Sequence, residues 1–123
     1  MAEQKYIDFI QKLHNKTKSQ VIKWGYLDAA ESVYTKMGWT DGLIGLPTFD
    51  TDKSFISKID SYYVVLLTND KSLTDLYVIP STYKNICVLK AEDYGEYTTR
   101  LYNLVRSRFP DADAFITNFI NKP

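Results

Sequence analysis

The segment from Tyr62 to Asp70, YYVVLLTND, constrains the fold more than any other part of the chain. Its β-branched and aromatic residues predict a strand, in which successive side chains point to opposite faces of a sheet. Both faces of this strand are apolar, one carrying Tyr62, Val64 and Leu66 and the other Tyr63, Val65 and Leu67. Since a sheet that meets water usually has one polar face, this strand requires a cover on each side.

Four further segments are rich in strand-forming residues and are separated by turn signals. They are Val21–Leu27, Ser54–Ile59, Leu73–Ile79 and Asn85–Lys90. The residues NDKS predict a turn after the central strand, and Pro80 predicts the end of pairing in the next one. Consecutive strands joined by short turns favour an antiparallel meander of four to five strands.

Helical periodicity appears before and after these strands. The predicted helices span residues 3–18, Ala29–Met37 and Asp93–Arg108, with a last short helix after FPDAD. Asp28 and Glu31 have the spacing of a capping box, Gly38 follows a last turn, and Asp111 or Asp113 could cap the final helix. We therefore predict a single α+β domain over residues 1–123, with the antiparallel sheet packed against an N-terminal helix and C-terminal helices.

The second face of the sheet needs a cover that the sequence does not assign uniquely. Three candidates are the loop 38–53, the terminal helix with Phe115 and Phe119, and another protein chain. The loop carries three glycines beside several large apolar side chains, so we expect it to act as a lid. On this interpretation, Trp39→Ala or Phe49→Ala should lower the melting temperature of the isolated monomer.

Charge and cysteine content narrow the class of protein. The formal net charge is zero, which argues against general nucleic-acid binding because no overall field attracts phosphates. The single cysteine, Cys87, excludes an internal disulfide and lies in an apolar run, where a buried thiol is expected. The N-terminus lacks the apolar core of a signal peptide and no segment has the length of a membrane span, so we expect a cytoplasmic protein.

Motifs for metal and cofactor chemistry are weak. Asp50–Ser61 starts like a calcium loop, but Phe55 stands where the sharp turn needs glycine and Ser61 where a bidentate glutamate is needed. Asp50, Asp52 and Asp60 could hold magnesium in a nuclease, although no accompanying base or lysine has a recognisable spacing. A capped turn into a strand explains these carboxylates more simply, so we predict no metal and no cofactor.

Catalytic and phosphate-binding patterns are also missing. The loop glycines fit neither the dinucleotide nor the phosphate-loop spacing, and the single histidine, His14, cannot supply a multi-histidine zinc site. Two basic runs, one of lysines between residues 12 and 23 and one of arginines between residues 100 and 108, are explained by the helix C-termini that they occupy. Together with exposed tyrosines they could also bind a phosphate or a single strand.

The overall pattern of the chain resembles that of small bacterial and phage proteins. The resemblance lies in two segments, FIQKLHNKTKSQVIKW, which leads into the strands, and YTTRLYNLVRSRFPDADAFITNFI, which follows them. The resemblance includes no catalytic motif, and it assigns no functional residue.

The surplus of tyrosine and of apolar surface favours a non-enzymatic protein-binding module, for example an inhibitor or immunity-type protein that occludes a partner. Another protein is the expected partner, and a homodimer is a further way to cover the sheet. The candidate binding residues are Trp39, Leu43, Ile44, Phe49, Asp50, Asp52 and Tyr77. The alternative is a small-ligand, nucleotide-like binding protein in which residues 38–53 close as a lid over Trp24, Trp39, Tyr62 or Tyr77.

Overall fold

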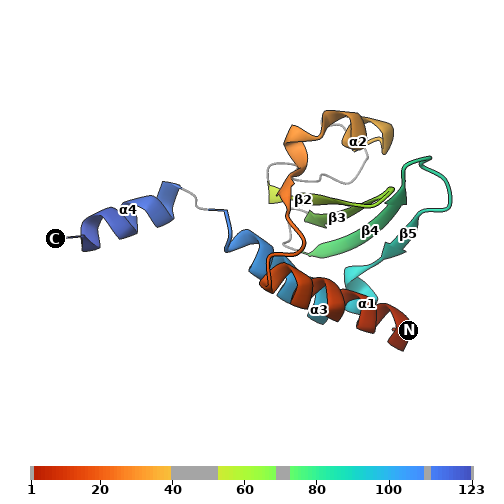
Figure 1. The fold of residues 1–123 in the computed structure, drawn as a ribbon, viewed down its shortest axis with the longest axis horizontal. Helices are drawn as coiled ribbons and strands as arrows, with labels where there is room; N and C mark the ends of the chain where they lie inside the picture. Colours follow the sequence, from red (N-terminus) through yellow and green to blue (C-terminus); the bar gives the residue numbers. More distant parts are fainter. Residues whose placement is uncertain (1, 40–52, 69–72, 110–111, 123) are drawn as a thin grey trace.

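The computed structural model describes residues 2–39, 53–68, 73–109 and 112–122. Its elements follow the predicted order with shifted ends (Figure 1). They are α1 (Gln4–Lys18), β1 (Gly25–Tyr26), the 3₁₀ turn η1 (Leu27–Ala29), α2 (Glu31–Lys36), β2 (Phe55–Ile59), β3 (Tyr62–Thr68), β4 (Thr74–Pro80), β5 (Cys87–Leu89), α3 (Ala91–Arg106) and α4 (Ala112–Asn121). The predicted NDKS turn lies outside the described residues.

The five strands form one antiparallel meander in the order β1-β2-β3-β4-β5, as predicted. A tight turn joins β2 to β3, with Ile59 opposite Tyr62 and Asp60 at a positive φ of 55°. Pro80 has no backbone N–H to donate, and because it is the last residue of β4 it interrupts no strand pairing beyond it. The central strand β3 is therefore paired along both edges, and its two apolar faces must be covered by other elements.

Helices α1 and α3 lie side by side on one face of the sheet (Figure 1). Their buried stripe meets the inward side chains of the strands in one core, which contains Ile10, Leu13, Phe55, Val64, Leu66, Leu76, Leu89, Tyr94, Leu101, Tyr102 and Val105. Polar contacts fix α3 on β4, because Thr98 Oγ1 donates to the carbonyl of Thr74 at 2.8 Å and Ala91 N–H donates to Asp75 Oδ1 at 2.7 Å. This confirms the predicted packing on the first and the penultimate helices.

The opposite face of the sheet is covered by the segment from Leu27 to Trp39, which contains η1 and α2 (Figure 1). The second core comprises Leu27, Val33, Trp39, Val65, Leu67, Tyr77 and Ile79. A Schellman motif places Trp39 there, because Gly38 has a φ of 74° and Trp39 N–H donates to the carbonyl of Tyr34 at 2.9 Å. Both covers required by the strand pattern are therefore present within the described chain.

Two predictions about the start of the chain are wrong in detail. The strand expected over Val21–Leu27 is limited to Gly25–Tyr26, because Ile22 and Trp24 are apolar for packing against the first core and not for strand pairing. The capping box at Asp28 and Glu31 does not form: α2 follows Ala30, which makes no side-chain cap, while Asp28 belongs to the 3₁₀ turn.

Two further predictions are corrected by burial. The thiol of Cys87 is free, and the residue is half-buried because β5 lies at the edge of the sheet. Helix α4 does not cover the sheet: it lies apart from it (Figure 1), and Phe115 and Phe119 are 65% and 68% exposed. In the described part of the chain no helix has the length and apolar character needed to cross a membrane.

Candidate functional site

The structure brings together two of the predicted binding residues, Trp39 and Tyr77. Their rings meet edge to face at 4.9 Å between centroids, and each residue is only 8% exposed. Both side chains therefore belong to the second core. Five other predicted residues, Leu43, Ile44, Phe49, Asp50 and Asp52, lie outside the described residues, and their binding role stays a prediction.

Packing in the second core changes the pKa of the Tyr77 phenol. Burial raises the pKa of Tyr77, and the negative charge of Asp75, two residues earlier on the same strand, raises it further. A phenol is already neutral at ordinary pH, and the raised pKa extends its neutral form to higher pH. Here Tyr77 acts as a packing residue with a polar tip.

The lid proposed over several aromatic residues cannot cover all of them. Trp24 packs against the first core, whereas Trp39 and Tyr77 belong to the second core on the other side of the sheet. Tyr62 stands at the start of β3 and is 48% exposed. A single closing loop could therefore reach either Trp24 or the Trp39–Tyr77 pair, because the sheet separates them.

The largest apolar side chains left in solvent belong to α4. Four of them form one stripe at helical spacing, and their exposed fractions are high: Phe115 65%, Ile116 53%, Phe119 68% and Ile120 72%. The two phenylalanine rings lie one turn apart with centroids 5.9 Å from each other. We call this set the α4 stripe. It is an apolar helix face with no cover among the described residues.

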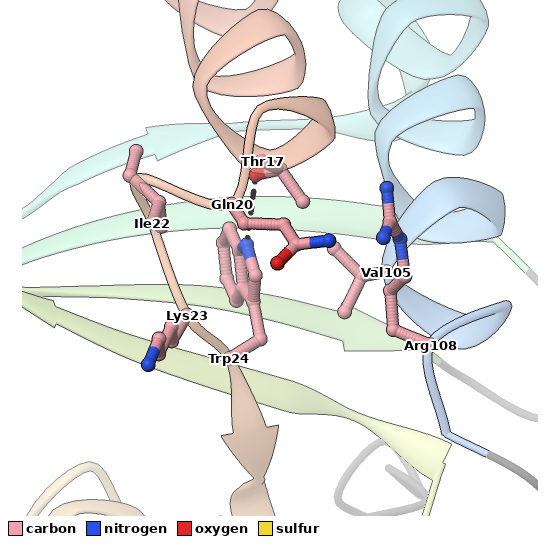
Figure 2. Close-up of a pocket in the computed structure, with 7 residues that line it drawn as sticks. All are labelled: Thr17, Gln20, Ile22, Lys23, Trp24, Val105 and Arg108. Carbon is pink, nitrogen blue, oxygen red and sulfur yellow. Dashed lines mark hydrogen bonds between the residues drawn. The ribbon is translucent and has the colours of Figure 1, made fainter.

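A pocket of about 290 Å³ lies where the C-terminal ends of α1 and α3 meet the segment before β1 (Figure 2). We call it the Trp24 pocket; its lining residues are Thr17, Gln20, Ile22, Lys23, Trp24, Val105 and Arg108. The indole is fixed because Trp24 Nε1–H donates to Thr17 Oγ1 at 2.9 Å. Gln20 and Arg108 extend on either side of Val105, and Lys23 directs its ammonium group away from the indole (Figure 2). This arrangement can hold a ligand, and its described lining offers no carboxylate, imidazole or thiol for acid–base or nucleophilic chemistry.

A second pocket of about 260 Å³ lies on the outer side of α1 and α3 and includes His14, Tyr97 and Arg100. His14 is half-buried there, as expected for a boundary residue. Across the residues that the structure describes, no group of three or more His, Cys, Asp or Glu side chains could hold a metal ion. Residues 55–59 of the suspected calcium loop form β2 and pair with β3, which argues against the calcium-loop conformation.

Comparison of the chain with protein-family models, with curated proteins and with solved structures finds no match.

The sequence predicts the apolar spacing of the α4 stripe and offers this helix as one of three candidates to cover the sheet, a role that the exposure of Phe115 and Phe119 excludes. The pairs Phe115/Phe119 and Ile116/Ile120 indicated which face of the helix is apolar, and they could not indicate what meets that face. The Trp24 pocket was missed, because it depends on Gln20, Trp24 and Arg108 meeting in space. The available signal in the sequence was that a basic run stands near the C-terminal end of each of these two helices.

Proposed function

We propose that this protein is a protein-binding module whose docking element is α4. The observation that carries the proposal is the α4 stripe, with four large apolar side chains between 53% and 72% exposed on one face of a helix. Soluble monomers rarely expose large contiguous apolar patches without a function. Both faces of the sheet already have covers among the described residues, where α4 carries the largest group of exposed apolar side chains.

The length of α4 supports the same conclusion. Isolated helices shorter than about 12–15 residues are only marginally stable in water, and α4 has 10 residues. Tertiary packing normally provides the missing stability, but the described side chains of α4 are exposed. An apolar groove on a partner would supply that packing, in the mode where an amphipathic helix places anchors at i and i+4 into a groove.

The size of the stripe favours a groove on a different protein over a second copy of α4. Four side chains at these exposures present roughly 500 Å² of apolar surface, whereas a stable interface needs about 800 Å² per partner. Two α4 helices packed against each other would share only part of the stripe. A groove encloses the stripe from both sides and adds contacts from its rim. Occlusion of the partner's own site, as in an inhibitor or immunity-type protein, is one form of this proposal.

The test compares charge-matched variants of α4. Phe115→Glu with Phe119→Glu places two charges on the stripe, and Thr117→Glu with Asn118→Glu places the same charges on the opposite side of the helix. Affinity capture with quantitative mass spectrometry identifies a partner, and calorimetry with that purified partner measures its affinity. We expect the stripe variant to lose binding by at least about 100-fold, while the control keeps it and a peptide of residues 111–123 competes.

Equal affinity of the wild type and the stripe variant for every captured partner would contradict the proposal. Thermal unfolding of both variants is the folding control. Because all four substituted residues are exposed, both variants should melt with the wild type.

A further inference from the structure

The Trp24 pocket lies beside the basic C-terminal ends of α1 and α3. Arg108 Nη2 donates to the carbonyl of Lys18 at 3.3 Å, which places the C-terminal ends of α1 and α3 next to each other. Five cations belong to this region: Lys16, Lys18, Lys23, Arg106 and Arg108. Within the described ranges, no carboxylate lies within ion-pair distance of any of them.

Helix capping accounts for only one of these charges, that of Arg108, which donates to the carbonyl of Lys18 at the end of α1. The carbonyls of Asn15, Lys16 and Thr17 already accept backbone N–H groups from residues 19–22, and those of Asn103, Val105 and Arg106 accept from residues 107–109. Two helix C-termini together carry roughly one negative elementary charge, against five positive side chains. A positive surplus therefore remains beside the pocket in a chain whose formal net charge is zero.

The conformation of Gln20 places a polar group over the pocket. Gln20 is the residue after the C-cap of α1, and its φ of 65° lies in the left-handed region in which helices commonly end. The amide of Gln20 reaches across the indole toward Val105 (Figure 2), so this residue contributes a polar group to the pocket.

We propose that the Trp24 pocket binds a small aromatic anion, a flat ring that carries a phosphate or a carboxylate. The volume of about 290 Å³ is at the small end of ligand sites. The ring packs against Trp24 between Ile22 and Val105. Arg108 has five N–H groups, of which one is used on Lys18, and the others bind the anionic group together with the Gln20 amide.

Nuclear magnetic resonance tests this proposal with an internal control. The chain has two tryptophans, so its ¹H–¹⁵N spectrum has two indole signals, assigned with a Trp39→Phe variant. The ligands are phenyl phosphate and benzoate. Inorganic phosphate and phenol, which carry the anionic group and the aromatic ring separately, are the controls. Each compound is titrated to about 20 mM. We expect phenyl phosphate, benzoate or both to shift the Trp24 signal saturably, with a lower dissociation constant than inorganic phosphate or phenol. The signal of Trp39, which lies on the far side of the sheet, should not move.

Variants locate the anion. Arg108→Ala should weaken the binding about tenfold or more, while Lys12→Ala, another exposed cation on α1, should leave it unchanged. The difference between phenyl phosphate and benzoate shows which anionic group the site takes. The absence of a saturable Trp24 shift with either ligand, or an equal dissociation constant in Arg108→Ala, would overturn the proposal.

Discussion

The apolar side chains of the first core and those of α4 are alike in type and opposite in exposure. Phe55 is 2% exposed and stacks on Phe109 with centroids 4.9 Å apart, whereas Phe115 is 65% exposed. Phe55 lies in β2, within the core where the sheet meets α1 and α3, whereas Phe115 lies on a helix face with no cover among the described residues. Strand alternation marks the first position as apolar and helical spacing marks the second, and neither pattern tells whether the side chain is buried within this chain.

A large effect on stability is expected at the cover of the second face. Trp39→Ala should lower the free energy of unfolding by about 3–5 kcal/mol, because it removes a buried indole from contact with Tyr77. Urea unfolding of the isolated monomer measures this change, and Trp39→Phe should lose less. A loss below about 1 kcal/mol would show that this layer is dispensable and would remove the contrast with α4.

A smaller effect is expected where α3 meets the sheet. Thr98→Val keeps the shape of a fully buried side chain but removes its hydrogen bond to the carbonyl of Thr74. The loss should be about 1–3 kcal/mol in the same unfolding experiment, because a buried acceptor loses its partner. Thr99→Val, at the exposed neighbouring position, is the matched control and should change little. If both variants lose the same stability, the attachment of α3 does not depend on this bond.

The pH dependence of stability reports on burial at Tyr77. Because burial and Asp75 raise the pKa of Tyr77 in the folded protein, the folded state holds the phenolic proton more tightly than the unfolded chain. This contribution is complete below the unfolded pKa of about 10 and is lost as the pH rises through the raised folded pKa. Tyr77→Phe should therefore lose less stability than the wild type between about pH 9.5 and 11. Identical profiles for Tyr77→Phe and the wild type would contradict the burial of Tyr77.

The smallest effect is expected on α4. Phe115→Ala should change the free energy of unfolding by less than about 0.5 kcal/mol, because most of its ring is already in water. Phe55→Ala makes the same chemical change inside the first core and should lose about 3–5 kcal/mol. Equal losses at the two positions would show that α4 packs on the body.

The sequence was sufficient to predict the sheet and its need for a cover on each face, because alternation along a strand assigns each side chain to a face. Val64 and Val65 illustrate this, since they belong to the first and the second core respectively. The sequence did not identify the segment from Leu27 to Trp39 as the cover of the second face. It was not sufficient to separate apolar packing from strand pairing at Ile22 and Trp24. These residues were assigned to a strand, but they are apolar because they pack against the first core. A sequence pattern also cannot specify contacts between distant segments, such as those that build the Trp24 pocket from Gln20 and Arg108.

Native-state hydrogen exchange compares α3 and α4 within one sample and tests the central claim most directly. Amides in the middle of α3, such as that of Leu101, should exchange only on global unfolding, because their helix is packed on the sheet. In the free protein, amides of α4 from Phe115 onward should exchange within about 100-fold of unstructured rates, since an unsupported helix of this length is marginal. Protection of α4 equal to that of α3 in the monomer would contradict the account, because it would show that α4 already has the packing for which a partner is proposed.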